Sequence, residues 1–125
     1  MKKPPTECVN DRVKSGWKNV VKPTLDRLNL PLCDLTMIDV GSGTGRKSLK
    51  KYAFDDKHLR IPGYSVVPSN MAGIEGDKTR LAQLKINVPG VEAFLFDFSK
   101  NGLKGLDIQK KYHVVLPCEV LEHLH

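Results

Sequence analysis

Apolar positions along the chain form two patterns: a helical spacing of three and four residues, and short continuous runs. Between residues 10 and 30, apolar side chains return every three or four positions, which predicts an amphipathic helix that Pro23 kinks or divides. The same spacing predicts helices over residues 46–54 and 77–86, and a further helix starts at Glu119. Each of these helices has one apolar side, so we expect it to cover a sheet.

Short apolar runs bounded by glycine, proline or charged residues predict strands. The four runs are residues 35–40, 71–75, 91–96 and 113–116. Because they alternate with helical segments, the pattern favours right-handed βαβ units. We therefore predict an α/β fold, a Rossmann-like parallel sheet with helices on both faces. A polar connection precedes the last strand and carries a short helix over residues 106–110.

The chain of 125 residues is long enough for one domain with one hydrophobic core. We expect a helical cover over residues 1–34 and the core of the domain over residues 35–125. Residues 55–70 are charged at first and then rich in proline and glycine, which interrupts the alternation. We interpret them as an insertion.

The net charge of +6 comes from the N-terminal half. Residues 1–60 hold 13 Lys and Arg against 7 Asp and Glu, whereas residues 61–125 hold 7 against 7. Such a half attracts anionic ligands or nucleic acid, or it is a set of solvated helix faces. Solvated helix faces are the commoner case, and no aromatic residues are interleaved with the basic ones to favour nucleic acid.

The three cysteines, Cys8, Cys33 and Cys118, are odd in number and match no C-x-x-C spacing. They are typical of free thiols in a reducing compartment, so we expect a cytoplasmic protein. The N-terminus lacks the apolar core of a signal peptide, and no stretch approaches the length of a membrane span. We expect no membrane partner.

The stretch IDVGSGTGRKS, residues 38–48, carries the main candidate chemistry. It is one residue from a P-loop, which cradles phosphates with backbone N–H groups and a lysine. A P-loop needs glycine directly before that lysine, and Arg46 occupies the position. The dinucleotide fingerprint G-x-G-x-x-G fails at the same residue. A nucleotide-binding function keeps some support, because the third predicted strand leads into Asp97, a candidate magnesium ligand.

Four motifs in order resemble the class I S-adenosylmethionine-dependent methyltransferases. The first is h-D-x-G-x-G-x-G, where h is apolar, and Glu75 follows as the acid that ends the second strand. Asp97 and Phe98 follow the third strand. The segment VVLPCEVLEHL, residues 114–124, is similar to the family's fourth-strand motif. The resemblance covers residues 38–125.

This resemblance implies that S-adenosylmethionine is the cofactor and that its methyl group passes to an acceptor. It implies roles for nine residues: Asp39, Gly41, Ser42, Gly43, Gly45, Glu75, Asp97, Phe98 and Glu119. The loop would hold the methionine part of the cofactor, with Asp39 fixing the loop and meeting the ammonium group. Glu75 would bind the ribose, with Asp77 as the reserve candidate, and Asp97 with Phe98 the adenine. No general base is indicated, and the acceptor is a small molecule or RNA.

A second candidate site is a metal centre at Glu119, Glu122 and His123. Residues three and four apart share a helix face, so these side chains can converge on one cation. In the branch of the family that methylates the 2′-hydroxyl at RNA 3′ ends, such a segment binds metal. In other members it forms the edge of the pocket, so the resemblance leaves both readings open.

The family's sheet usually has seven strands, and this sequence predicts four. We expect a domain that is incomplete at its C-terminus, with a sheet edge open to self-association or to a partner. The alternatives to a methyltransferase are an inactive cofactor-binding or interaction fragment of the same fold and, with less support, P-loop-like nucleotide binding.

Overall fold

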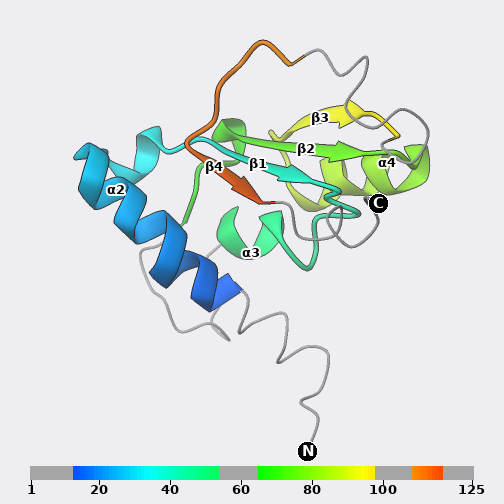
Figure 1. The fold of residues 1–125 in the computed structure, drawn as a ribbon. Coiled ribbons are helices and arrows are strands. Elements are labelled where there is room, and N and C mark those ends of the chain that lie inside the picture. The colour runs from blue at the N-terminus through cyan, green and yellow to red at the C-terminus, as the bar shows by residue number, and fades with distance from the viewer. Residues whose placement is uncertain (1–12, 54–64, 98–107, 117–125) are drawn as a thin grey trace, which may run out of the picture.

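A computed structural model describes residues 13–53, 65–97 and 108–116. Four strands form one parallel sheet in the order β3-β2-β1-β4 (Figure 1). Their bounds are Met37–Val40 for β1, Met71–Glu75 for β2, Glu92–Leu95 for β3 and Val114–Leu116 for β4. The predicted α/β, Rossmann-like parallel sheet is confirmed, and each strand lies within its predicted run.

Strand β1 is central, since Met37 lies opposite Met71 of β2 and opposite Val114 of β4. The chain moves outward from β1 to β2 and β3, and then returns to the far side of β1 to form β4. The strand order therefore reverses between β1 and β4. In open α/β sheets, ligands bind at such a point, outside the carboxyl ends of the strands.

The N-terminal helix is irregular one turn before Pro23. It is helical from Val13, passes through a π-helical turn at Trp17–Val21 (η1), and continues as α2, Lys22–Leu28. Because proline has no N–H to donate, the bonding pattern shifts, and the Lys22 N–H donates to the Trp17 carbonyl. The helix is continuous from residue 13 to Leu28, so Pro23 does not divide it, and the irregularity expected there takes the form of the π-helical turn.

The other two described helices follow β1 and β2. Helix α3 spans Leu49–Ala53, three residues later than the predicted start, because residues 46–48 form turns. Helix α4 spans Lys78–Asn87 and agrees with the prediction to within a residue. Two 3-10 turns, η2 (Leu32–Asp34) and η3 (Pro68–Asn70), precede β1 and β2.

All three described helices cover the same face of the sheet (Figure 1). Right-handed connections that move in one direction, from β1 to β2 to β3, place their helices on one face. The return from β3 to β4 runs the other way, so the same handedness predicts a connection on the opposite face. The described end of this connection agrees, because Ile108 and Tyr112 pack near Ile38 and Ile74. The prediction of a short helix over residues 106–110 is wrong for residues 108–110, which have no helical structure. They reach this face of the sheet as an irregular segment.

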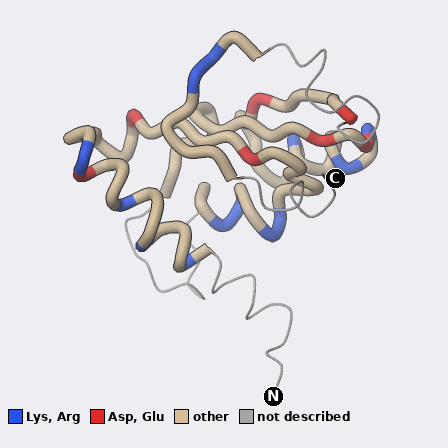
Figure 2. Tube along the Cα trace, viewed as in Figure 1, with Lys and Arg blue, Asp and Glu red and all other residues tan. Residues whose placement is uncertain are grey.

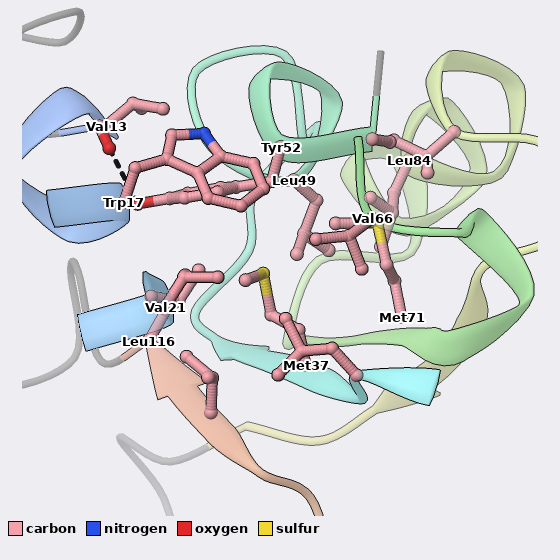
Figure 3. Packing of buried hydrophobic residues seen from close by; sticks show 14 of the residues in the cluster. Val13, Trp17, Val21, Met37, Leu49, Tyr52, Val66, Met71, Leu84 and Leu116 are labelled. Atoms are coloured by element: carbon pink, nitrogen blue, oxygen red, sulfur yellow. Dashed lines mark hydrogen bonds between the residues drawn. The ribbon is translucent and has the colours of Figure 1, made fainter. Parts of the chain in front are cut away.

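The main core lies between the helices and the sheet (Figure 3). Its fully buried side chains include Val21, Met37, Leu49, Met71 and Leu84. The predicted apolar faces of α3 and α4 are buried. On the N-terminal helix, Val21 is fully buried as its apolar spacing predicts, whereas Val20 is 42% and Leu28 49% exposed.

Part of the predicted insertion also belongs to this core. Val66 is fully buried, and its N–H donates to the Tyr52 carbonyl at 2.7 Å. In the three described segments, every helix is too short or too polar to cross a membrane.

Candidate functional site

The glycine loop after β1 bends over the end of the neighbouring strand. The N–H groups of Gly41 and Ser42 both donate to the Ile74 carbonyl of β2, at 2.9 and 3.0 Å. Gly41, Gly43 and Gly45 have φ values of 78°, 59° and 76°. These positive values are costly for any residue with a Cβ atom, so the three glycines of the sequence motif are required by the path of the backbone.

Gly43 and Gly45 differ in what surrounds them. A Cβ atom on Gly45 would collide with the Leu84 side chain, so this glycine lets α4 pack against the loop. A Cβ atom on Gly43 would meet nothing within 4 Å. The loop is therefore closed toward the core at Gly45 and open at Gly43.

The carboxylate of Glu75 ties this open part of the loop to the end of β2. One oxygen accepts from the Gly43 N–H at 3.1 Å, and the other accepts from the Asp77 N–H at 2.9 Å. Asp77, the reserve candidate for the ribose, is instead the N-cap of α4 and accepts from the N–H groups of Thr79 and Arg80. Of the two acids, only Glu75 touches the glycine loop.

Asp97 lies beside Glu75. The Phe96 N–H donates to the Glu75 carbonyl at 3.0 Å, and a Cβ atom on Gly76 would be 3.2 Å from the Asp97 Cα atom. The absence of a side chain at Gly76 thus lets the two chain segments approach. Two partly buried acids, Glu75 and Asp97, stand at the carboxyl ends of neighbouring strands, as the sequence motifs predicted.

Asp39 has a different environment, since it is only 1% exposed and points to the helix side of the sheet. Its Oδ2 atom accepts from the Ser48 hydroxyl at 2.6 Å. This bond connects β1 to the far end of the glycine loop. The geometry favours the role of fixing the loop, which was one of the two expected for Asp39.

Ser42 also points away from the open part of the loop. It is 7% exposed, and its Oγ atom would be 2.8 Å from a Cβ atom on Gly73, in the middle of β2. Within the described residues its hydroxyl has no hydrogen-bond partner. The side chain of Ser42 therefore packs beneath the loop, and only its backbone is placed at the expected cofactor site.

A phosphate cradle does not fit this geometry. A P-loop needs backbone N–H groups that point at the phosphate, whereas those of Gly41 and Ser42 bond to β2 and that of Gly43 bonds to a carboxylate. A negative carboxylate at this place repels phosphate. Arg46 and Lys47 are exposed beyond the loop.

Two supporting residues were missed by the sequence interpretation. Asn87, at the end of α4, donates from its amide to the Thr44 carbonyl at 2.9 Å, and Ser48 holds Asp39 as described above. In the sequence, Ser48 stands out only as the last residue of the P-loop-like pattern. Asn87 carried no signal, because it lies 43 positions from the residue it supports.

The remaining predicted site residues, Phe98, Glu119, Glu122 and His123, lie outside the described residues. In the described part of the chain, no three His, Cys, Asp or Glu side chains gather as a metal site. The metal centre predicted at the C-terminus stays a prediction.

No protein-family model matches the chain, and no curated protein matches it. A solved structure that it resembles is that of CalS10 with bound S-adenosylmethionine, an amino pentose methyltransferase from Micromonospora echinaspora involved in calicheamicin biosynthesis. The two are 17% identical with a TM-score of 0.43, over 88% of this chain and 33% of that one. This chain thus spans about one third of that enzyme's length. Because the likeness is low, the fold class rests on the strand order and connections described above.

Proposed function

We propose that this chain binds S-adenosylmethionine at the carboxyl ends of β1, β2 and β3, and that it forms the cofactor-binding part of a methyltransferase. The observation that carries the proposal is the hydrogen bond from the Gly43 N–H to the Glu75 carboxylate. It brings the two most informative sequence motifs, separated by 32 positions, to one place. The order of the motifs along the chain supports the same function.

The chemistry of the site suits this cofactor. Ionised carboxylates only accept hydrogen bonds, and the ribose hydroxyls of S-adenosylmethionine are donors. Glu75 and Asp97 therefore complement the ribose and the adenine amino group, while the positive sulfonium and ammonium groups are attracted to a region of acidic side chains. Gly43 leaves open space in which the methionine part fits against the backbone.

The cofactor supplies an activated methyl group, so the protein mainly has to align an acceptor with it. In the described residues, the chain contributes binding and orientation: the glycine loop, Glu75 and Asp97 fix the cofactor. The acceptor, a small molecule or RNA, stays open, and so does the identity of any general base.

Isothermal titration with S-adenosylhomocysteine, the product of the reaction, tests the proposal. We expect binding to the wild-type chain and a loss of about tenfold or more in affinity for Glu75→Gln, because one charge-assisted bond is worth about 1.5–3 kcal/mol. Glu92→Gln is the matched control, since Glu92 is an exposed acid at the opposite end of the sheet. Equal affinities in the two variants, or no heat with the wild type, would contradict the proposal.

ATP with magnesium in the same experiment tests the nucleotide alternative. The geometry of the loop leads us to expect no binding. A methyl-transfer assay with candidate acceptors then separates an active enzyme from a fragment that only binds the cofactor.

A further inference from the structure

The helix layer of the molecule carries a group of exposed basic side chains, which we call the basic surface. Its members are Lys14, Lys18 and Lys22 of the N-terminal helix and Arg46, Lys47 and Lys50 around the start of α3. All six are exposed. Figure 2 shows the basic positions following α2 and continuing through α3 toward the glycine loop.

Ring and hydrogen-bond contacts hold the two halves of the basic surface together. The rings of Trp17 and Tyr52 lie with their centroids 5.3 Å apart, and the Tyr52 hydroxyl donates to the Val13 carbonyl at 3.4 Å (Figure 3). Gly16 lets this helix approach, because a Cβ atom there would collide with the Tyr52 hydroxyl. In the sequence, Lys14 and Lys18 directly follow Val13 and Trp17, and Lys50 lies two positions before Tyr52. The two groups of basic residues therefore lie on elements that pack against each other.

Acidic side chains neutralise little of this charge. Residues 13–53 hold eight Lys and Arg against three Asp, and one of the three, Asp39, is buried. The partly buried acids Glu75 and Asp97 stand at the carboxyl ends of the strands. Within the described residues, the segment 13–53 thus carries an excess of basic side chains, while Glu75 and Asp97 make the strand ends acidic.

We propose that the basic surface binds the phosphate backbone of a nucleic acid strand. Clustered Lys and Arg release condensed counterions from the strand, and this term supplies sequence-independent affinity. The surface carries no described aromatic side chain for base stacking, since Trp17 and Tyr52 are buried, so the contacts are with phosphates and not with bases.

The burial of the helix's apolar side favours nucleic acid over a membrane. A helix that lies on a bilayer inserts its apolar face into the lipid. Here Val13, Trp17 and Val21 are 3%, 4% and 0% exposed and form part of the core. Two apolar side chains of this helix, Val20 and Leu28, are exposed at 42% and 49%, whereas its main apolar side is taken up by the core and is not available to lipid.

The position of the basic surface relates it to the glycine loop, although the binding that we propose needs no cofactor. Arg46 and Lys47 directly follow Gly45, so one end of the surface borders the loop. A strand bound along the helix layer would pass the edge of the sheet at which we place the cofactor.

The test measures the binding of a fluorescently labelled 20-nucleotide RNA, and of DNA with the same sequence, over a range of salt concentrations. One variant combines Lys14→Gln, Lys18→Gln and Lys22→Gln, and a second combines Arg46→Gln, Lys47→Gln and Lys50→Gln. The matched control, Lys78→Gln with Lys85→Gln and Lys111→Gln, removes the same charge from exposed positions elsewhere. Circular dichroism establishes that each variant is folded.

We expect each basic-surface variant to bind at least about tenfold more weakly than the wild type, and its slope of log affinity against log salt to fall by about 2, at about 0.7 per lost phosphate contact. The control should keep the wild-type slope. Equal losses in the control would mean that net charge alone attracts the strand, which overturns the proposal. So would the absence of binding to both strands, or binding only to vesicles of anionic lipid when these are tested in place of the strands.

Discussion

Substitution of two glycines in one loop, Gly43→Ala and Gly45→Ala, tests the geometry of the candidate site. Both residues have positive φ, so alanine costs about 1–2 kcal/mol at either position. Part of this cost is offset, because alanine lowers the entropy of the unfolded chain by the equivalent of about 0.4–1 kcal/mol. The backbone cost is therefore the same for both variants. Any difference in their free energies of unfolding comes from the atoms that surround each new methyl group.

At Gly45 the new methyl group collides with Leu84, which is fully buried and held by the core. Overpacking of this kind costs about 1–3 kcal/mol more. We expect Gly45→Ala to lower the free energy of unfolding by about 2–4 kcal/mol, and Gly43→Ala by about 1 kcal/mol or less. The side chain at position 43 has open space, so only the backbone strain is felt.

Urea denaturation measures the difference. With a slope of about 1–3 kcal/mol per molar urea, the midpoints of the two variants should differ by roughly 1 M. Gly43→Ala should also bind S-adenosylhomocysteine about tenfold or more weakly, since its methyl group would occupy the proposed cofactor space. Coincident urea midpoints would refute the packing of Leu84 on Gly45. Unchanged binding by a folded Gly43→Ala variant would refute the placement of the cofactor.

Three further changes follow from single contacts. Asp77→Ala removes the N-cap of α4 and should cost about 1 kcal/mol of stability, whereas Asp77→Asn should retain most of it; equal losses in urea melts would argue against the cap. Ser42→Ala removes a buried hydroxyl without a described partner, so stability should be unchanged or rise by up to about 1 kcal/mol, with S-adenosylhomocysteine affinity retained. Burial raises the pKa of Tyr112 above its usual 10.0, and the charge of Glu92 raises it further. The folded state thus holds the Tyr112 proton more tightly than the unfolded chain does. The contribution of Tyr112 to the free energy of unfolding is complete below pH 10.0, the ordinary pKa, and is lost as the pH rises through the higher pKa of the folded state. Tyr112→Phe should remove this part of the loss of stability at alkaline pH. Urea melts at a series of pH values measure it, and the same pH dependence in the variant and the wild type would contradict the role of Tyr112.

The strands and their parallel arrangement could be predicted because local pattern and general topology suffice for them. The run 71–75 matches β2 residue for residue, since its ends are marked by Asn70 and Gly76. The helices were less predictable. The N-terminal helix contains a π-helical turn and leaves Val20 exposed beside the buried Val21, and the apolar spacing alone cannot reveal an inserted residue.

The sequence predicted which residues form the candidate site, but it did not predict the contacts between them. The motifs selected Gly43 and Glu75, yet they could not show that the two are directly bonded or that Ser42 points to the core. Such facts depend on the register between β1 and β2 and on the packing of α4, which involve residues 30 to 45 positions apart. Asn87 was missed for the same reason.

A titration of the ¹⁵N-labelled chain with S-adenosylhomocysteine, followed by NMR, tests the central claim most directly. The Gly43 N–H donates to the Glu75 carboxylate, so its chemical shift reports on the site itself. We expect the largest shifts at the amides of Gly43, Gly76 and Asp97, with those of the N-terminal helix unchanged. Shifts that spare these three amides, or a spectrum that saturating ligand leaves unaltered, would contradict the account.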